Sequence, residues 1–196
     1  MKKFLLTITA IAGITFASQA QTEAGKTMIG GSIRFSTTSE KDSDEKENSF
    51  SIEPQIGYFV ANNIAVGTRI GYGWSKDESG SGQETINNSF SVSPFGRIYQ
   101  GGGPVKFFGQ LSIPISWRKA KLNDDEVGTN SSYGVALSPG LAYFPTERIG
   151  IEFSVTGLYF NSTKHESDVF DNNWTRNDFG LNVNSQTPSI GVQFHF

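Results

Sequence analysis

The chain has no cysteine among its 196 residues and only two histidines. This composition excludes disulfide frameworks, thiol catalysis, cysteine-ligated metals and a lipid-modified cysteine. Basic residues are also outnumbered. The formal charge of −3 falls to −5 when Lys2 and Lys3 leave with the leader described below. A negative chain is a poor match for nucleic acid, so we expect no partner of that class.

Long apolar runs are missing beyond the first twenty residues. Lys2 and Lys3 precede an apolar stretch that ends near Ala17, and the small residues Ser18 and Ala20 follow. This order is typical of a secretory signal peptide, which we predict over residues 1–20 with cleavage before Gln21. After residue 25, no stretch is apolar enough for a membrane-spanning helix, and helical periodicity is absent.

A period of two residues replaces the missing helical pattern. Apolar and polar side chains alternate through eight segments, which predict eight β-strands. The segments cover 29–35, 50–58, 64–74, 90–98, 105–117, 133–143, 149–159 and 190–196. Together with the leader they give two predicted regions, a signal peptide at 1–20 and a barrel domain at 25–196.

The connections between these segments alternate in length. Short turns of Gly, Pro and Asn composition lie at 61–63, 101–104 and 145–148. Long polar loops are expected to begin at Thr37, Lys76, Leu122 and Glu166. Short and long connections at opposite ends are typical of an all-β, eight-stranded antiparallel up-and-down barrel.

The number of apolar side chains indicates whether the apolar face of the strands points outward or into the lumen. Nearly all large apolar residues fall on one face, and an eight-stranded interior is too narrow to hold them. We therefore expect the apolar face to contact lipid and the other face to line the lumen. A polar cluster is predicted there, with Glu53 between Arg34 and Arg69; its members are Arg34, Glu53, Arg69, Arg97, Lys106 and Glu152.

Aromatic residues on the apolar face recur at about the same height, roughly 25 Å above the short turns. They predict an upper aromatic girdle of Phe50, Trp74, Phe90, Trp117, Tyr133 and Tyr159. The alternative is that strands are simply rich in aromatic residues, which would give no common height.

These features resemble the outer-membrane beta-barrel, porin-like domain family, that is, the small eight-stranded OmpX/OmpA-type barrels of Gram-negative bacteria. The resemblance covers about residues 25–196 and includes the closing segment GVQFHF. It implies a monomer in the cell outer membrane, with outer-membrane lipid and lipopolysaccharide as surroundings. It also implies that Phe196 is part of the assembly signal that the barrel-assembly machinery reads.

Groups able to carry chemistry are few, and we expect no enzyme, cofactor or metal site. His165 lies near Ser162 and Glu166, but no spacing there fixes a catalytic geometry. Glu40–Glu47 lacks the Gly and distant Glu of a calcium loop.

Three functions stay open at this point. A structural or surface-interaction role through the long loops comes first, because polar side chains would plug the lumen. A narrow pore or hydrophobic-solute conduit is the alternative, and a lipid A-modifying enzyme is third. The alternation also has one irregularity near its end, because Leu181 and Val183 are at odd-numbered positions whereas Ile190 is at an even-numbered one. This switch predicts a β-bulge between Asn184 and Pro188.

Overall fold

The computed structural model describes residues 22–39, 46–80, 82–123, 125–167, 173–182 and 189–196. The described residues contain no helix long and apolar enough to cross a membrane. They form eleven strand segments. These are β1 (Thr27–Ser39), β2 (Lys46–Ala61), β3 (Ile64–Glu78), β4 (Glu84–Gln100), β5 (Val105–Ser112), β6 (Ile115–Leu122), β7 (Asp125–Tyr143), β8 (Ile149–Ser154), β9 (Gly157–Ser167), β10 (Trp174–Asn182) and β11 (Ser189–His195).

Three pairs of segments are the halves of single long strands, so the described segments make eight strands. β5 and β6 are separated only by Ile113 and Pro114, where the proline has no N–H to donate. The ladder continues through this point, because Ile113 N–H donates to the carbonyl of Pro94 at 3.0 Å. β8 and β9 form a second such strand, and β10 and β11 form the third.

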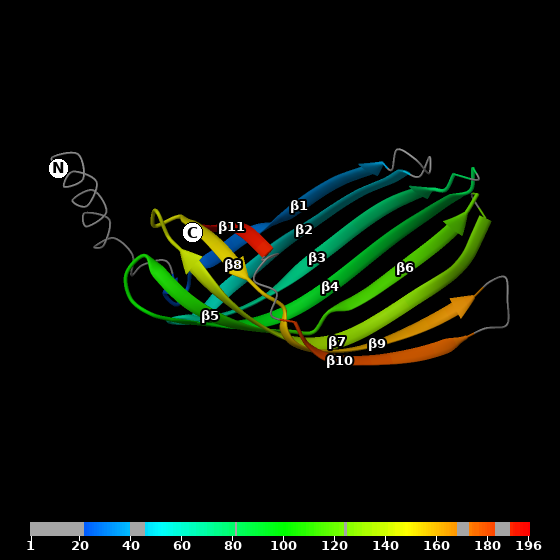
Figure 1. Cartoon of the computed structure of the whole chain (residues 1–196). Helices are drawn as coiled ribbons and strands as arrows, with labels where there is room; N and C mark the ends of the chain where they lie inside the picture. The colour runs from blue at the N-terminus through cyan, green and yellow to red at the C-terminus, as the bar shows by residue number, and fades with distance from the viewer. Residues whose placement is uncertain (1–21, 40–45, 81, 124, 168–172, 183–188) are drawn as a thin grey trace.

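Every neighbouring pair of strands is antiparallel, and the sheet closes on itself. β1 pairs with β2 along its whole length and with β11 from Met28 to Gly31. β11 pairs in turn with β8, and β8 pairs with β7. The predicted eight-stranded antiparallel barrel is therefore confirmed (Figure 1).

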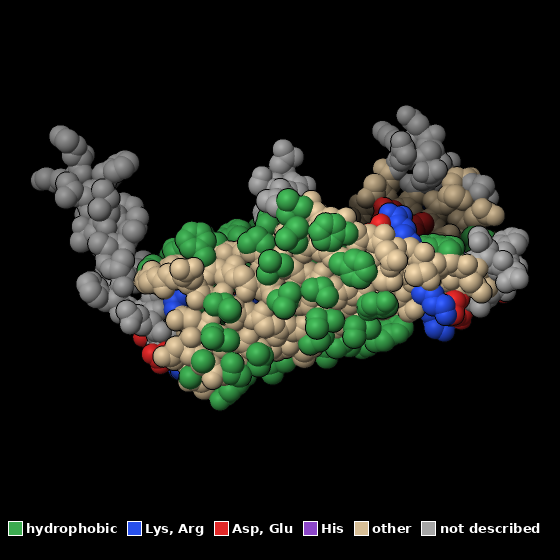
Figure 2. Space-filling model, turned by 90° about the horizontal axis from the view of Figure 1, so that it is seen from below, with side chains coloured by type: hydrophobic (Ala, Val, Ile, Leu, Met, Phe, Trp, Pro, Cys, Tyr) green, Lys and Arg blue, Asp and Glu red, His purple; other side chains and the backbone are tan. Residues whose placement is uncertain are grey.

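Large apolar side chains lie on the outside of this barrel. Figure 2 shows them scattered in a broad band between the two ends, with charged side chains gathered at the ends. Exposed members from five strands include Ile56, Val66, Ile98, Leu111 and Val192. A soluble sheet would bury such a face, so this arrangement requires an apolar solvent.

The described parts of the long polar connections are mostly paired strand, which corrects the expectation of long loops there. β1 and β2 stay in register as far as Ser39 and Lys46, and β3 and β4 stay paired up to Glu78 and Glu84. β9 extends to Ser167 opposite Gly128 of β7. We call these polar strand ends, which reach Ser39, Lys46, Glu78, Glu84, Gly128 and Ser167, the sheet extension. Its backbone groups are hydrogen-bonded between strands, which gives it more order than a loop.

A one-residue bulge between β8 and β9 changes which side chains face outward. Ser154 pairs with Gly140, whereas Leu158 pairs with Leu137, so three residues of this strand oppose two of β7. Gly157 has a φ of 62°, and a Cβ there would clash with the carbonyl oxygen of Leu137. A glycine with positive φ is the usual partner of such a bulge.

This bulge makes the predicted facing of Tyr159 wrong. Beyond the bulge, Leu158 and Phe160 take the outer face, and Tyr159 shares the inner face with Ala136 and Gly180. The continuous odd-numbered alternation expected over 149–159 assumed that no residue was inserted. A single extra residue reverses every later side chain in the strand.

The irregularity predicted between Asn184 and Pro188 lies outside the described residues. The described pairs on either side of it differ in register. Asn182 pairs with Gly157, and Ser189 pairs with Ser154. Six residues therefore lie between Asn182 and Ser189 in the chain, whereas only two lie between their partners Ser154 and Gly157.

The seam between β1 and β10 is the one place where the described strands do not pair around the barrel. β1 pairs with β11 only as far as Gly31, and no described residue of β10 pairs with Ser32–Ser39. Figure 1 shows β1 and β10 at opposite edges of the curved sheet. The exposed fractions of Ile33 and Phe35 are 72% and 74%. These are about twice the exposed fractions of their partners on β2, Ile52 and Phe50, at 37% each.

Candidate functional site

A buried ion pair between β4 and β8 lies inside the lumen. Arg97 donates to Glu152 at 2.5 Å and to the side-chain oxygen of Gln110 at 2.6 and 2.9 Å. Tyr99 also donates to Glu152, at 3.1 Å. Arg97 and Glu152 are only 3% and 6% exposed. A charge this deeply buried is tolerable because it is paired and hydrogen-bonded.

Aromatic rings pack below this ion pair at the short-turn end of the lumen. The ring centroid of Tyr99 lies 5.8 Å from that of Phe59, 5.7 Å from Phe108 and 6.4 Å from Phe144. The His195 ring lies 5.3 Å from Phe144 and 5.8 Å from Phe59. We call this group, with Arg97 and Glu152 above it, the lumen seal.

Sequence reasoning missed the aromatic half of the seal. Each ring neighbours an outward-facing apolar residue in the chain, as in Tyr58-Phe59, Ile98-Tyr99, Phe107-Phe108 and Tyr143-Phe144. Two consecutive large apolar residues in a strand must point to opposite faces. The recurrence of such consecutive apolar pairs near the short turns was the feature of the sequence that could have predicted an apolar lumen at that end.

Lys106 lies at the short-turn mouth of the lumen and does not join Arg97. Its amine donates to the Thr22 hydroxyl at 2.5 Å and to Asn63 at 3.1 Å. The Thr22 hydroxyl also donates to Asn63 at 2.6 Å. This network ties the first described residue to the turn between β2 and β3.

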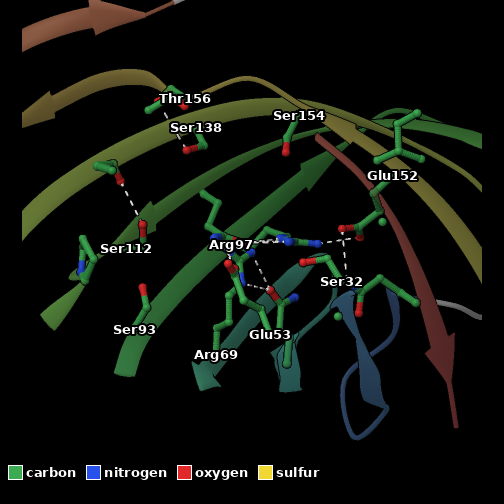
Figure 3. A pocket seen from close by; sticks show the side chains of 18 of the residues that line it. Ser32, Glu53, Arg69, Ser93, Arg97, Ser112, Ser138, Glu152, Ser154 and Thr156 are labelled. Atoms are coloured by element: carbon green, nitrogen blue, oxygen red, sulfur yellow. Dashed lines mark hydrogen bonds and ion pairs between the residues drawn. The ribbon is translucent and has the colours of Figure 1, made fainter. Parts of the chain in front are cut away.

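Above the seal, the lumen opens into a cavity of about 780 Å³. Figure 3 shows Arg97 at its centre, with Arg69 and Glu53 on one side and Ser138, Ser154 and Thr156 on the other, while Ser32 and Ser93 lie beside Glu53 and Arg69, their partners in the strand register. Arg69 lies 3.9 Å from the Glu53 carboxylate and donates to Gln55 at 2.9 Å. The hydroxyl groups that line the cavity belong to Ser32, Ser93, Ser112, Ser138, Ser154 and Thr156.

The predicted polar cluster therefore divides into separate groups. Glu53 pairs with Arg69 as expected, but Arg34 makes no ion pair with it. Arg34 stands opposite Ser51 in the β1–β2 register, and Glu53 stands opposite Ser32, two positions away. The expectation that the Glu53 carboxylate lies between the guanidinium groups of Arg34 and Arg69 was therefore wrong, because Arg34 is two positions away from Glu53 in this register.

The remaining predicted girdle residues lie on the outer face. Phe50 is paired with Trp74, and Phe90 is paired with Trp117, their ring centroids 6.1 Å apart. Tyr133 is exposed on β7. Tyr159, as described, points inward, and Phe160 occupies the outer position beside it. Phe196 ends the chain next to β1, where its N–H donates to the carbonyl of Thr27 at 2.9 Å.

His165 lies in the sheet extension against Asn130 and Trp174. Its Nδ1 lies 2.6 Å from Asn130 Oδ1, and its ring stacks on Trp174 at 5.2 Å. Ser162 is three positions away in β9 and therefore faces the other side of the sheet. The described residues contain no group of three or more His, Asp or Glu side chains able to hold a metal ion.

Comparison with known proteins gives the family. The model of the outer membrane protein beta-barrel domain matches residues 6–196. The chain belongs to this family. Membership places this outer-membrane barrel in the outer membrane, in agreement with its apolar exterior.

A solved structure of Neisserial surface protein A (NspA) is similar to this outer-membrane barrel. The two chains are 14% identical, and the alignment covers 88% of this chain and 98% of the other, with a TM-score of 0.46. A search of curated protein sequences found no match.

The two carboxylates of the lumen are expected to differ sharply in their effect on stability. Glu152→Gln leaves the Arg97 charge buried without its counter-ion, so it should lower the free energy of unfolding by about 3–5 kcal/mol. Glu53→Gln affects a pair whose side chains are both more than one-third exposed. It should cost less than about 1 kcal/mol.

Urea unfolding of both variants in lipid vesicles checks this difference. Each is an isosteric loss of one charge on a lumen-facing strand, so either serves as the control for the other. Equal shifts of the two unfolding midpoints would contradict the buried pairing of Arg97 and Glu152.

Proposed function

We propose that this outer-membrane barrel does not conduct and that it serves a structural or surface-interaction role through its sheet extension. The observation that carries the proposal is the lumen seal, in which a buried ion pair and packed rings fill the short-turn end. An eight-stranded barrel has room for little more than side chains. A continuous aqueous path would need both layers of the seal to move.

The sheet extension supports the surface role. Its strands are joined by side-chain ion pairs as well as by backbone pairing. Lys76 lies 2.9 Å from both Glu78 and Glu84, and Lys119 lies 3.1 Å from Glu126. The hydrogen bond from Lys76 also holds the pKa of the Glu78 carboxyl below its ordinary value. An ordered polar sheet presents a fixed pattern of side chains, which favours recognition because little conformational entropy is lost on binding.

A narrow pore is the competing function. The cavity above the seal supports it only in part, since that cavity stops at Arg97 and Glu152. A lipid A-modifying enzyme has less support, because Ser162 and His165 lie on opposite faces of β9. We therefore propose no catalytic role.

Planar-bilayer recording separates the non-conducting barrel from the pore. The wild-type barrel is expected to give no discrete ion-current steps. The double variant Tyr99→Ala with Phe108→Ala removes two rings of the seal and is expected to produce steps. Phe107→Ala, which removes a neighbouring ring on the outer face, is the matched control and should stay silent.

Steps from the wild-type barrel would contradict the proposal, particularly if Ser138→Trp in the cavity abolished them. Retention of the folded, heat-modifiable gel mobility shows that each variant still forms a barrel.

Site-specific cross-linking tests the surface role. The chain has no cysteine, so Gly80→Cys at the tip of the β3–β4 hairpin can carry a photo-activated cross-linker on the sheet extension. Gly102→Cys places the same group at a short turn and is the control. Intact cells should give adducts with a surface glycan or protein at position 80 and not at 102. Equal adducts at both positions, or none at 80, would contradict the surface role.

A further inference from the structure

The inner face of β7, β9 and β10 carries rows of polar and aromatic side chains. The three strands lie side by side in the barrel wall (Figure 1), and residues directly opposite each other share a face. Leu158 and Phe160 face outward, so the alternate residues of β9 face inward. The registers then give four inward rows, which we call the inner wall. These rows are Asn130, His165 and Trp174; Ser132, Thr163 and Arg176; Gly134, Asn161 and Asp178; and Ala136, Tyr159 and Gly180.

An indole ring lies at the sheet-extension end of the inner wall. Trp174 stacks on His165, with the ring centroids 5.2 Å apart and the ring planes at 22°. His165 is held in turn by Asn130, whose Oδ1 lies 2.6 Å from Nδ1. One face of the indole is therefore covered and its position is fixed, while 42% of Trp174 is exposed. A fixed, exposed indole offers a flat apolar surface on which a ligand can stack.

Hydrogen-bonding groups follow the indole along the inner wall. Arg176 donates from Nε to Oδ1 of Asp178 at 2.8 Å, and its Nη2 lies 2.8 Å from the same oxygen. Because both contacts use Oδ1, this pair leaves Oδ2 of Asp178 as an acceptor. Asn161 donates to the Thr163 hydroxyl at 3.0 Å, which holds both side chains on the wall. Donors and acceptors side by side suit a ligand with many hydroxyl groups, since each hydroxyl both donates and accepts.

The charges of the inner wall cancel. Arg176 and Asp178 neutralise each other, and the other residues of the four rows are uncharged apart from His165. An anionic ligand would meet the Asp178 carboxylate beside Arg176, and a cationic ligand would meet Arg176 beside the indole. The inner wall therefore favours a ligand that is polar but uncharged.

A second aromatic ring marks the other end of the inner wall. Tyr159 lies across Gly180, where a Cβ would be only 2.7 Å from the Tyr159 hydroxyl oxygen. Trp174 and Gly180 are six positions apart, which is about 20 Å along the strand. A polar strip of this length between two aromatic side chains matches an extended ligand better than a compact one.

We propose that the inner wall binds a short, linear, uncharged oligosaccharide of a glycan on another surface. A sugar ring has a face of C–H groups, which stacks on Trp174, and a rim of hydroxyl groups, which exchange hydrogen bonds with Arg176 and Asp178. The inference deepens the proposed surface role and rests on it, because it names the class of the partner.

Other occupants match the inner wall less closely. Extended peptides bind at sheet edges, where they add a strand through backbone groups. The inner wall is a sheet face instead, and β9 at its centre pairs with both β7 and β10. Glycolipids of the surrounding membrane lie against the outer face of the barrel, whereas the inner wall faces the barrel axis. A chain end from another surface reaches it directly.

A glycan array tests the proposal with the purified barrel in a polyoxyethylene detergent, which has no sugar headgroup. The array carries the neutral chains maltohexaose, cellohexaose, chitohexaose and lacto-N-tetraose. It also carries sialylated lacto-N-tetraose and the oligosaccharide released from lipopolysaccharide by mild acid, both of which are anionic. The wild-type barrel is expected to bind at least one neutral chain more tightly than either anionic one.

Substitution of the indole identifies the stacking contact. Trp174→Ala should weaken binding of the neutral chain by at least about tenfold, which corresponds to about 1.4 kcal/mol. Trp174→Phe keeps an aromatic ring and should retain part of the affinity. Phe179→Ala removes a ring that is 77% exposed on the outer face of the same strand, so it is the matched control and should bind as the wild type does.

Substitution of the carboxylate identifies the charge balance. Asp178→Asn keeps the size of the side chain but leaves the charge of Arg176 uncompensated. The preference should shift toward sialylated lacto-N-tetraose, because the inner wall then carries a net positive charge. A purely structural effect would instead weaken the binding of all chains alike.

Three results would overturn the proposal. The first is binding to none of the arrayed chains, and the second is equal losses for Trp174→Ala and Phe179→Ala. The third is tighter binding of the lipopolysaccharide oligosaccharide than of every neutral chain, which would make the partner a component of the surrounding membrane. Protein adducts at Gly80→Cys combined with a silent array would leave the surface role standing and overturn only the glycan. Unchanged heat-modifiable mobility excludes misfolding of the variants as the cause.

Discussion

Backbone hydrogen bonding in a solvent that offers none is the constraint on which this structure depends. A sheet in lipid must pair its edges, and β11 closes the described sheet at the short-turn end by pairing with both β1 and β8. Once the sheet closes, the period-two alternation separates an apolar exterior from an enclosed lumen. The arrangement of charges and rings in the lumen follows from that closure.

The lumen that results has two unlike halves. At the short-turn end, packed rings lower the local polarity around Arg97 and Glu152, and the Arg97 guanidinium lies 4.3 Å from the centre of the Phe108 ring. A buried ion pair with this many hydrogen bonds is costly to break. At the other end the described walls carry small hydroxyl side chains, which leaves the cavity. The same strands thus provide both the seal and the cavity.

The sequence predicted the exterior of the barrel better than its interior. Alternation is strict on the lipid face because every outward residue meets the same solvent, so the strands and their short turns could be read directly. Lumen residues meet different neighbours at each height, and their partners depend on register. Arg34 illustrates this, since an offset of two positions removes it from Glu53.

Local irregularities account for the other differences. Gly157 within an apolar strand was the visible sign of the bulge that turns Tyr159 inward, because glycine in a strand interior often marks one. The polar ends of the strands carried no apolar alternation, so their pairing as a sheet extension could not be predicted from hydrophobic periodicity. Backbone pairing between the strands orders that region, and cross-strand ion pairs such as Lys119 with Glu126 accompany it.

The central proposal is that the lumen is open above the seal and closed below it. Thiol labelling tests this most directly, because Ser93→Cys and Gly102→Cys each introduce the only thiol in the chain, one in the cavity and one at a short turn. In vesicles with oriented barrels, a membrane-impermeant maleimide should label position 93 only from the side of the sheet extension. It should label position 102 only from the side of the short turns. Labelling of position 93 at the same rate from the short-turn side would contradict the account.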